Sequence, residues 1–309
     1  MSWIVLGCSK FARRRVFPAL ASFVDVIHVA SQRASEAELA AIPKLGKTFR
    51  DYEQALAEPG VVYISLTNDA HAQWAERALE LGHHVVVDKP AFIDLPTAER
   101  LVAVAKRRGL VLAEATSWPF HPQLELVRGA FAEAGSAPLL ATAQFLAPIP
   151  ADNIRMQRAL GGGALLDIGP YAASFGRVVF GGEPTSVYAR VHSRNAEVDT
   201  AFSVLIEYGE GRAVVGHFGF TTEYRSWIHL GGPGCSVDAH GMFSTPPDVE
   251  TEITIRRRDV VTTTKAPAAF ALQRFLAAVT EAIARGDSDT FANMLLADAR
   301  VREALASHA

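Results

Sequence analysis

The first strand and turn of the chain decide its fold: Trp3-Ile4-Val5-Leu6-Gly7-Cys8-Ser9-Lys10-Phe11-Ala12. An apolar strand ends at Gly7, and a helical stretch follows from Phe11 to Ala21. A dinucleotide-binding turn takes glycine, any residue, glycine, two residues and a small residue. Gly7 and Ala12 fit its first and last positions, and Ser9 replaces the middle glycine with a hydroxyl that could donate to a phosphate. This pattern predicts a dinucleotide-binding turn, with an ordinary tight turn as the alternative.

The rest of the first half alternates short apolar strands with helices. Strands are expected over residues 24–30, 61–66, 85–87 and 110–113, and helices over residues 51–57, 69–81 and 98–108. Wholly apolar strands that alternate with helices are typical of a parallel sheet covered on both faces. The predicted fold class is therefore α/β, with an N-terminal doubly wound parallel sheet of the Rossmann type. Ligands are expected outside the carboxyl ends of its strands.

From about Pro119 the pattern changes to alternating strands with few helices between them. Strand-like segments cover residues 200–208, 212–221, 226–230, 252–255 and 260–264, and two helices close the chain. These segments predict a C-terminal α/β domain with an open, largely antiparallel sheet. We expect a dinucleotide-binding domain over residues 1–118 and a substrate-binding and oligomerisation domain over residues 119–309. Because an open sheet face needs cover, a homodimer or homotetramer through this face is expected.

Composition and charge exclude several classes of protein. The 309 residues carry a formal net charge of −3, so the basic runs at residues 13–15 and 256–258 are expected to be solvated and no nucleic acid is expected to bind. Cys8 and Cys235 and the histidines stand in no metal-like spacing, which predicts no metal site. No apolar run reaches the length of a membrane span, and no signal peptide is recognised. We expect a cytoplasmic protein that does not bind membranes.

The residues after the second strand bear on the choice of cofactor. An acidic residue usually binds the ribose of NAD at this place, whereas an arginine accommodates the 2′-phosphate of NADP. The chain reads Ser31-Gln32-Arg33, which offers a hydroxyl and a guanidinium. NADP(H) is therefore the preferred cofactor. NAD(H) is the alternative, because Glu36 lies near and Arg33 could simply be solvated.

Three further segments carry candidate site residues. Asp88-Lys89-Pro90 ends the strand over residues 85–87, and Thr67-Asn68-Asp69-Ala70-His71 follows the strand over residues 61–66. The third segment is Gly161-Gly162-Gly163-Ala164-Leu165-Leu166-Asp167-Ile168-Gly169-Pro170-Tyr171. Its glycines allow a close approach to a ligand, and a helix after them would place Asp167 and Tyr171 on one face. The alternatives are a solvated lysine, a surface histidine and a packed tyrosine.

In this order and spacing, the first turn, Asp88-Lys89-Pro90 and the triple-glycine segment resemble the Gfo/Idh/MocA oxidoreductase family over nearly the whole chain. The family's usual Glu-Lys-Pro is Asp-Lys-Pro here. Tyr171 stands where its commonest motif has histidine, which resembles the sub-group of sugar and dihydrodiol dehydrogenases and nucleotide-sugar 3-ketoreductases. The segments most similar to the 3-ketoreductases are Arg14-Arg15, Pro18-Ala19-Leu20, His71-Ala72-Gln73-Trp74, His121-Pro122-Gln123, Ile154-Arg155 with Gln157, and Phe243 with Pro246-Pro247.

The resemblance implies a set of site residues. Lys89 and Tyr171 are the implied catalytic pair, with Asp167 beside them. The candidate cofactor-binding residues are Gly7, Cys8, Ser9, Lys10, Phe11, Ser31, Gln32, Arg33, Thr67, Asn68, His71, Asp88, Lys89 and Arg155. The candidate substrate-binding residues are Lys89, Trp118, Phe120, Arg155, Asp167, Tyr171 and Tyr224.

The implied reaction is hydride transfer between a nicotinamide and a sugar-like carbonyl or alcohol, most simply as a nucleotide-linked 3-keto-sugar reductase. Tyr171 would give the proton, and the Lys89 ammonium would polarise the carbonyl and favour the phenolate. The reverse assignment of Tyr171 and Lys89 stays open. The alternatives are an NADP-dependent sugar or trans-dihydrodiol dehydrogenase and a sensor that binds NADP without turnover.

Overall fold

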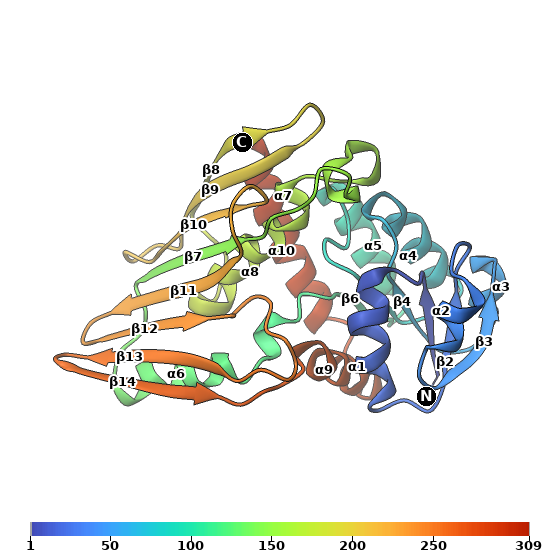
Figure 1. Ribbon diagram of the computed structural model, residues 1–309, viewed down its shortest axis with the longest axis horizontal. Helices are drawn as coiled ribbons and strands as arrows, with labels where there is room; N and C mark the ends of the chain where they lie inside the picture. The colour runs from blue at the N-terminus through green and yellow to red at the C-terminus, as the bar shows by residue number, and fades with distance from the viewer. Residues whose placement is uncertain (1, 309) are drawn as a thin grey trace. The chain divides into compact units, whose positions relative to one another are not determined.

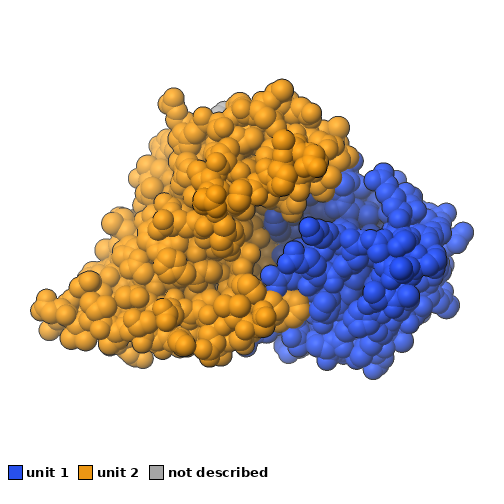
Figure 2. Space-filling view, in the orientation of Figure 1, with its two compact units in different colours: residues 1–115, 272–296 blue, residues 116–271, 297–309 orange. Residues whose placement is uncertain are grey.

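The computed structural model describes residues 2–308, which form two compact units (Figure 2). Unit 1 comprises the residues up to Ala115 together with Leu272–Leu296, and unit 2 comprises Thr116–Ala271 and the residues from Ala297 on. The first division falls close to the domain boundary proposed from the sequence. The grouping of Leu272–Leu296 with unit 1 has no counterpart in the sequence-based division.

Sheet A of unit 1 has six parallel strands in the order β3-β2-β1-β4-β5-β6 (Figure 1). This is the strand order of a dinucleotide-binding Rossmann fold, so the predicted doubly wound sheet is confirmed. Every residue of β1, β4 and β5 is buried, because helices cover both faces of the sheet. The strands are β1 (Trp3–Leu6), β2 (Ile27–Ala30), β3 (Leu45–Phe49), β4 (Val61–Ile64), β5 (Val85–Val87) and β6 (Leu112–Glu114).

The helix after β1 begins with a π-helical stretch, η1 (Ala12–Val16), and continues as α1 (Phe17–Ala21). Pro18 has no N–H to donate to the preceding turn, which accounts for the change of helix type beside it. A capping box at Ser35 starts the short helix α2, which the sequence-based prediction missed together with β3. The other helices of unit 1 are α2 (Glu36–Ala40), α3 (Tyr52–Leu56), η2 (Asn68–Ala70), α4 (His71–Glu80), α5 (Leu95–Arg107) and α9 (Ala271–Arg285). The last helix, α10 (Thr290–Ser307), begins in unit 1 and ends in unit 2.

Sheet B of unit 2 has eight strands in the order β14-β13-β12-β11-β7-β10-β9-β8. All neighbours are antiparallel except β7 and β10, so the predicted largely antiparallel sheet is confirmed. The strands are β7 (Leu140–Leu146), β8 (Ser186–Arg194), β9 (Asp199–Glu207), β10 (Ala213–Gly219), β11 (Arg225–Gly232), β12 (Cys235–His240), β13 (Thr251–Arg257) and β14 (Val260–Ala266). The helices of unit 2 are η3 (Trp118–Phe120), α6 (Gln123–Glu133), η4 (Ile154–Met156), η5 (Arg158–Leu160), α7 (Ala164–Asp167) and α8 (Gly169–Phe180).

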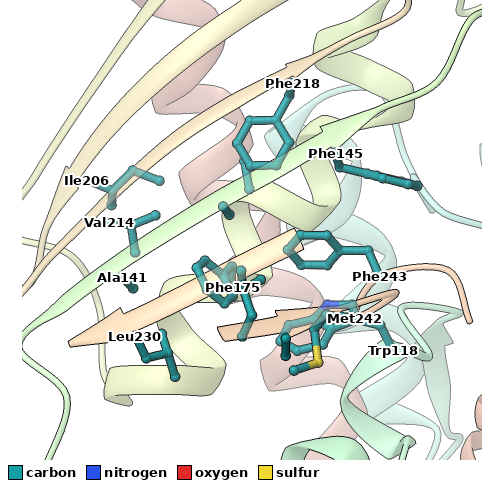
Figure 3. Packing of buried hydrophobic residues seen from close by; sticks show 14 of the residues in the cluster. Trp118, Ala141, Phe145, Phe175, Ile206, Val214, Phe218, Leu230, Met242 and Phe243 are labelled. Atoms are coloured by element: carbon teal, nitrogen blue, oxygen red, sulfur yellow. The ribbon is translucent and has the colours of Figure 1, made fainter. Parts of the chain in front are cut away.

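The two faces of sheet B differ in burial. Phe202, Val204 and Ile206 of β9 point into the core, in which Phe175 and Phe218 also pack (Figure 3). Ser203 and Leu205, which alternate with the inward residues of β9, face outward, and Leu205 is 40% exposed. Helices α6 and α8 pack against strands of this sheet, so one face is covered and the other lies open.

No helix within residues 2–308 is long and apolar enough to span a membrane.

Candidate active site

The turn after β1 requires glycine at its first position. Gly7 has φ +102°, and a Cβ atom there would lie 2.1 Å from the carbonyl oxygen of Ser65. Its N–H donates to the carbonyl oxygen of Ala30 at 2.8 Å. The side chains of Lys10 and Phe11 are exposed, and Cys8 is half-buried, which raises the pKa of its thiol. The first residue of the dinucleotide pattern is thus fixed by backbone packing.

Ser9, which replaces the second glycine, makes its hydrogen bonds to protein groups. Its Oγ accepts the N–H of Ala12 at 2.9 Å and lies 2.9 Å from Oγ of Ser65. Ser65 donates to Oδ2 of Asp88 at 2.7 Å. The structure therefore joins two candidate residues, Ser9 and Asp88, through a serine that the sequence analysis did not identify.

The carboxylate of Asp88 is held by two hydroxyl donors at the carboxyl end of sheet A. Besides Ser65, Tyr63 donates to Oδ1 at 2.6 Å. Burial raises the pKa of Asp88, while both hydrogen bonds and the charges of His71 and Lys89 act in the opposite direction. The pKa of Tyr63 lies well above its usual value because the ring is buried beside this carboxylate, so Tyr63 stays a donor.

Lys89 is half-buried, and the peptide bond between Lys89 and Pro90 is cis. The backbone on both sides of this bond is tied to neighbouring strands. The N–H of Asp88 donates to Ile64 at 3.0 Å, and the N–H of Ala91 donates to Oε2 of Glu114 at 2.7 Å. The position of the Lys89 backbone is therefore fixed by contacts within unit 1.

His71 is fully buried in the wall of this edge rather than on a helix surface. Its Nδ1 lies 2.9 Å from the carbonyl oxygen of Pro90, and its Nε2 lies 3.2 Å from that of Leu66. The ring thus bridges the segment after β4 and the segment after β5. Thr67 and Asn68, which lead into η2, are half-buried at the same edge.

The segment after β2 is shaped by Arg50 at the end of β3. Its Nη1 donates to the carbonyl oxygens of Ser31 and Ala34 at 3.2 and 2.5 Å, and its Nη2 forms an ion pair with Glu36. Oγ of Ser31 accepts the N–H of Ala34 at 3.1 Å. Gln32 and Arg33 are exposed. Glu36, the acidic residue near Arg33, is therefore paired with the guanidinium of Arg50.

Tyr171 lies in the first turn of α8, against an aromatic cluster of unit 2. Its ring centroid is 4.7 Å from that of Phe145 and 5.5 Å from that of Phe243. The start of α8 is held by Ser174, which accepts from the indole N–H of Trp118 at 2.9 Å and donates to the carbonyl oxygen of Pro170 at 2.7 Å. Figure 3 shows Phe145, Phe243 and Trp118 together in this core.

Arg155 and Asp167 form an ion pair in unit 2. Nε of Arg155 lies 2.9 Å from Oδ2 of Asp167, whose side chain is 14% exposed. The expected single helix through Asp167 and Tyr171 is wrong: α7 ends at Asp167, and α8 begins at Gly169. Pro170 in the first turn of α8 has no N–H to continue the earlier helix.

The backbone of the triple glycine at residues 161–163 lies close to other segments of unit 2. A Cβ atom on Gly162 would lie 2.6 Å from the carbonyl oxygen of Arg155, and one on Gly163 would lie 2.6 Å from Oδ1 of Asp199. Oδ2 of Asp199 accepts the N–H of Leu165 at 2.7 Å, at the start of α7. The glycines thus bring the backbone close to Arg155, which is itself paired with Asp167.

The three candidate aromatic residues differ in exposure. Trp118 is 3% exposed and packs at 5.4 Å between ring centroids against Phe243. Phe120 is half-buried, and Tyr224 is 54% exposed, with its ring 6.5 Å from that of Phe145. Of the three, Tyr224 offers the largest free surface.

Sequence reasoning missed the residues that hold the candidate side chains in place: Tyr63, Ser65, Glu114, Ser174 and Asp199. A signal for the first two was available, because they are the polar residues of an otherwise apolar segment at residues 61–66. Hydroxyls in a buried strand need partners. Within residues 2–308, no three His, Cys, Asp or Glu side chains are grouped so as to hold a metal ion.

Two family models match the chain. One describes an oxidoreductase family with an NAD-binding Rossmann fold and matches residues 1–116. The other describes the GFO/IDH/MocA C-terminal domain and matches residues 135–242. Together they span both kinds of sheet found in the structure.

Similar proteins of known name include sugar reductases and dehydrogenases. The dTDP-3,4-didehydro-2,6-dideoxy-alpha-D-glucose 3-reductase of Saccharopolyspora spinosa is 33% identical over 85% of this chain and 82% of its own length. The D-xylose 1-dehydrogenase (NADP(+)) 2 of Haloferax volcanii is 30% identical over 82% of this chain and 80% of its own length. The crystal structure of a 3-ketoreductase from Actinomadura kijaniata in complex with NADP and TDP-benzene superimposes with a TM-score of 0.91, at 29% identity, over 99% of this chain and 97% of that one.

The sheet topology, the glycine turn and these matches agree, and the chain belongs to the Gfo/Idh/MocA family of nicotinamide-dependent oxidoreductases.

Proposed function

We propose that this protein is an NADP(H)-dependent reductase of a nucleotide-linked 3-keto sugar. The observation that carries the proposal is the carboxyl edge of sheet A, where the Gly7 turn and the anchored Asp88-Lys89-Pro90 segment occur in one Rossmann sheet. The names of the similar reductases support the substrate class. The two cysteines are free thiols, which suits our expectation that the enzyme works in the cytoplasm.

The residues of unit 1 fit a dinucleotide. Gly7 packs against Ser65 at the carboxyl end of sheet A, where the backbone N–H groups of the turn would bind the diphosphate. Ser31, Gln32 and Arg33 would lie at the adenosine ribose, and Thr67 and Asn68 near the nicotinamide. Because Arg50 pairs with Glu36, the charge near Arg33 favours a 2′-phosphate. NADPH supplies the hydride when it is bound.

Tyr171 and Lys89 are the proposed catalytic residues. As the carbonyl is reduced, its oxygen gains negative charge, which the Lys89 ammonium stabilises. Tyr171 gives this oxygen its proton. The aromatic neighbours of Tyr171 fix its ring, so the hydroxyl keeps one direction.

Arg155 and Asp167 are proposed to act together on the nicotinamide side of the substrate. Their ion pair fixes the guanidinium, and the carboxylate keeps further lone pairs for sugar hydroxyls. Phe120 and Tyr224 are the proposed aromatic contacts to the sugar ring. We assign His71 a positioning role, because both of its ring nitrogens face backbone carbonyls.

The decisive experiment compares substrates and directions with the purified protein. We expect NADPH oxidation with dTDP-3,4-didehydro-2,6-dideoxyglucose, which is the substrate class named for the similar reductases. Faster NADP⁺ reduction with D-xylose or a trans-dihydrodiol would instead identify a dehydrogenase. NADPH binding without turnover on any of these compounds would identify a sensor.

We also propose that the open face of sheet B binds a second copy of the chain. Tyr188, Leu205 and Val215 pair across β8, β9 and β10, and each is at least 40% exposed. An exposed apolar row of this kind favours association. Light scattering of wild type and Val215→Glu tests it: the wild type should be an oligomer and the variant smaller. A monomeric wild type that is fully active would contradict the proposal.

A further inference from the structure

A chain of hydrogen bonds connects the dinucleotide turn to the segment that carries Lys89. It runs from the N–H of Ala12 to Oγ of Ser9, on to Oγ of Ser65, and from there to Oδ2 of Asp88, with lengths of 2.9, 2.9 and 2.7 Å. All four residues belong to unit 1. Ser65 is 1% exposed, so water does not compete for its hydroxyl.

The direction of donation along this chain follows from counting hydrogens. A carboxylate only accepts, so the single hydroxyl hydrogen of Ser65 goes to Asp88. The contact between the two serines then needs the hydrogen of Ser9. Ser9 accepts from Ala12 on its other side. Its hydroxyl therefore has no hydrogen left for a bound phosphate, which is also only an acceptor.

A second contact joins the same two segments without any side-chain hydroxyl. The backbone of Gly7 packs against the carbonyl of Ser65, and the N–H of Ser65 donates to the carbonyl oxygen of Leu6 at 2.8 Å. The N–H of Asp88 in turn donates to Ile64 at 3.0 Å. The turn after β1, the end of β4 and the end of β5 thus meet at Ser65, through the backbone as well as through hydroxyls.

We propose that Ser9 is a positioning residue, which fixes the dinucleotide turn on Ser65 and Asp88 instead of binding the diphosphate with its hydroxyl. This inference rests on the proposed use of the turn for NADPH. It reverses the expectation from the glycine pattern: restoring glycine by Ser9→Gly weakens NADPH binding, because the turn keeps its backbone contacts with the sheet but loses the hydrogen bonds made by the Ser9 hydroxyl. The backbone N–H groups of the turn remain the donors to the diphosphate.

Equilibrium titration of NADPH fluorescence with the full-length protein tests the proposal. Ser9→Gly, Ser9→Ala and Ser65→Ala should each raise the Kd for NADPH on the order of fivefold, which is the value of one lost hydrogen bond. Ser9→Thr keeps the hydroxyl and should bind nearly as the wild type does. The double variant of Ser9→Ala and Ser65→Ala should bind no worse than either single variant, because both break one chain.

Ser22→Ala is the matched control. It removes a serine hydroxyl of unit 1 that donates to the carbonyl oxygen of Ala19 at 2.6 Å, away from the path between Ser9 and Asp88, so its Kd for NADPH should stay within about twofold of wild type. Unchanged or tighter binding by Ser9→Gly would overturn the proposal. The proposal would also be overturned if the increases in Kd caused by Ser9→Ala and by Ser65→Ala multiplied in the double variant.

A measurement without cofactor separates this inference from the proposed function. Amide hydrogen exchange at Ala12 should be faster in Ser65→Ala than in wild type and unchanged in Ser22→Ala, because only the first loosens Ser9. If the wild type binds neither NADPH nor NADH, the proposed function fails while this result still stands. Equal exchange at Ala12 in all three proteins would show that no connection exists.

Discussion

Sheets A and B differ in how many of their faces are buried. In β5 of sheet A, Val85 and Val86 point to opposite faces, and both are 0% exposed. In β10 of sheet B, Val214 is 0% and Val215 is 51% exposed. A polar residue is therefore unusual in the fully buried strands β1, β4 and β5 of sheet A and ordinary in sheet B. The comparison teaches that polar residues in the sequence indicate a site far more sharply in unit 1 than in unit 2.

The two units also hold their candidate catalytic residues by different means. Lys89 is anchored through hydrogen bonds around its backbone, which involve His71 and Glu114. Tyr171 is anchored by ring packing on Phe145 and Phe243. A hydrogen bond is lost completely when one of its two groups is removed, whereas truncating one ring removes only part of the packing contacts.

The largest expected effect is on turnover, when one catalytic residue of either unit is removed. Tyr171→Phe should lower kcat by about a hundredfold or more, because a positioned proton donor is lost, while the Kd for NADPH stays unchanged. Lys89→Ala should lower kcat to a similar degree, because the charge that stabilises the oxygen is missing. Steady-state kinetics and NADPH titration measure both values.

The turnover of the two variants distinguishes the two assignments of the proton donor. Tyr171→Phe with near-normal turnover would refute the donor role and leave Lys89 as the acid. Full activity in Lys89→Ala would refute the site as a whole. Tyr188→Phe, on the open face of sheet B, is the control and should keep wild-type kcat.

The second prediction tests the contrast in burial directly with four valine-to-alanine variants. Val85→Ala, Val86→Ala and Val214→Ala should each lower the free energy of unfolding by about 1–3 kcal/mol, from lost burial and a residual cavity. Val215→Ala should change it by less than about 0.5 kcal/mol at a protein concentration low enough to dissociate the proposed second copy. Calorimetry at two protein concentrations checks this. An effect of Val215→Ala that grows with concentration would support the proposed second copy on this face, whereas a large effect at the low concentration, or a small effect for Val85 or Val86, would break the comparison.

The same contrast explains how much the sequence could predict. The strands over residues 3–6, 61–64 and 85–87 were found almost to the residue, because complete burial leaves an uninterrupted apolar run. β3 was missed, because the middle of this edge strand is exposed and reads Gly46-Lys47-Thr48. β8 was missed too, since its outward residues include Arg190 and His192.

The candidate site was predicted to a similar degree. Asp88 and Lys89 follow from their place after a buried strand. Tyr171 was first singled out by its spacing from Asp167 after the triple glycine, and its catalytic role was implied only by the resemblance to the family. Pro170 in the sequence already indicated a break of the helix, which the structure has between Asp167 and Gly169. The connection from Ser9 to Asp88 could not be predicted, because it joins residues of three strand ends that only the folded sheet brings together.

The third prediction concerns cofactor preference in unit 1. Arg33→Ala should lower the ratio of kcat/KM for NADPH to that for NADH by about ten- to a hundredfold, the value of a charge-assisted hydrogen bond. Arg33→Lys should lower it less, because the charge remains. Most of the change should appear in KM for NADPH, since Arg33 follows β2 and Lys89 follows β5, and two strands of sheet A lie between them. A wild type that prefers NADH would contradict the assignment of this residue.

The smallest expected effect is a change in the pH dependence of stability at His84, just before β5. Its Nδ1 accepts the N–H of Val111 at 3.0 Å, which requires an unprotonated nitrogen. Burial, and to a lesser extent His83, lowers the pKa of His84 below its ordinary value of 6.5. The unfolded chain therefore binds more protons in the window below 6.5. Stability is complete above this value and falls as the pH drops toward the folded pKa.

The variant His84→Asn isolates this contribution, because Oδ1 of asparagine can accept the same N–H without titrating. Urea unfolding at pH 7.0 and about 5.5 should show a smaller loss of stability in the variant than in wild type. The difference between the two pH slopes of the free energy of unfolding should correspond to less than one bound proton. His240→Asn is the control from sheet B, where the side chain is exposed, and should keep the wild-type slope. If His84→Asn loses stability as steeply as wild type, the acid sensitivity of unit 1 originates elsewhere, and sheet A tolerates a charge at the beginning of its buried strand.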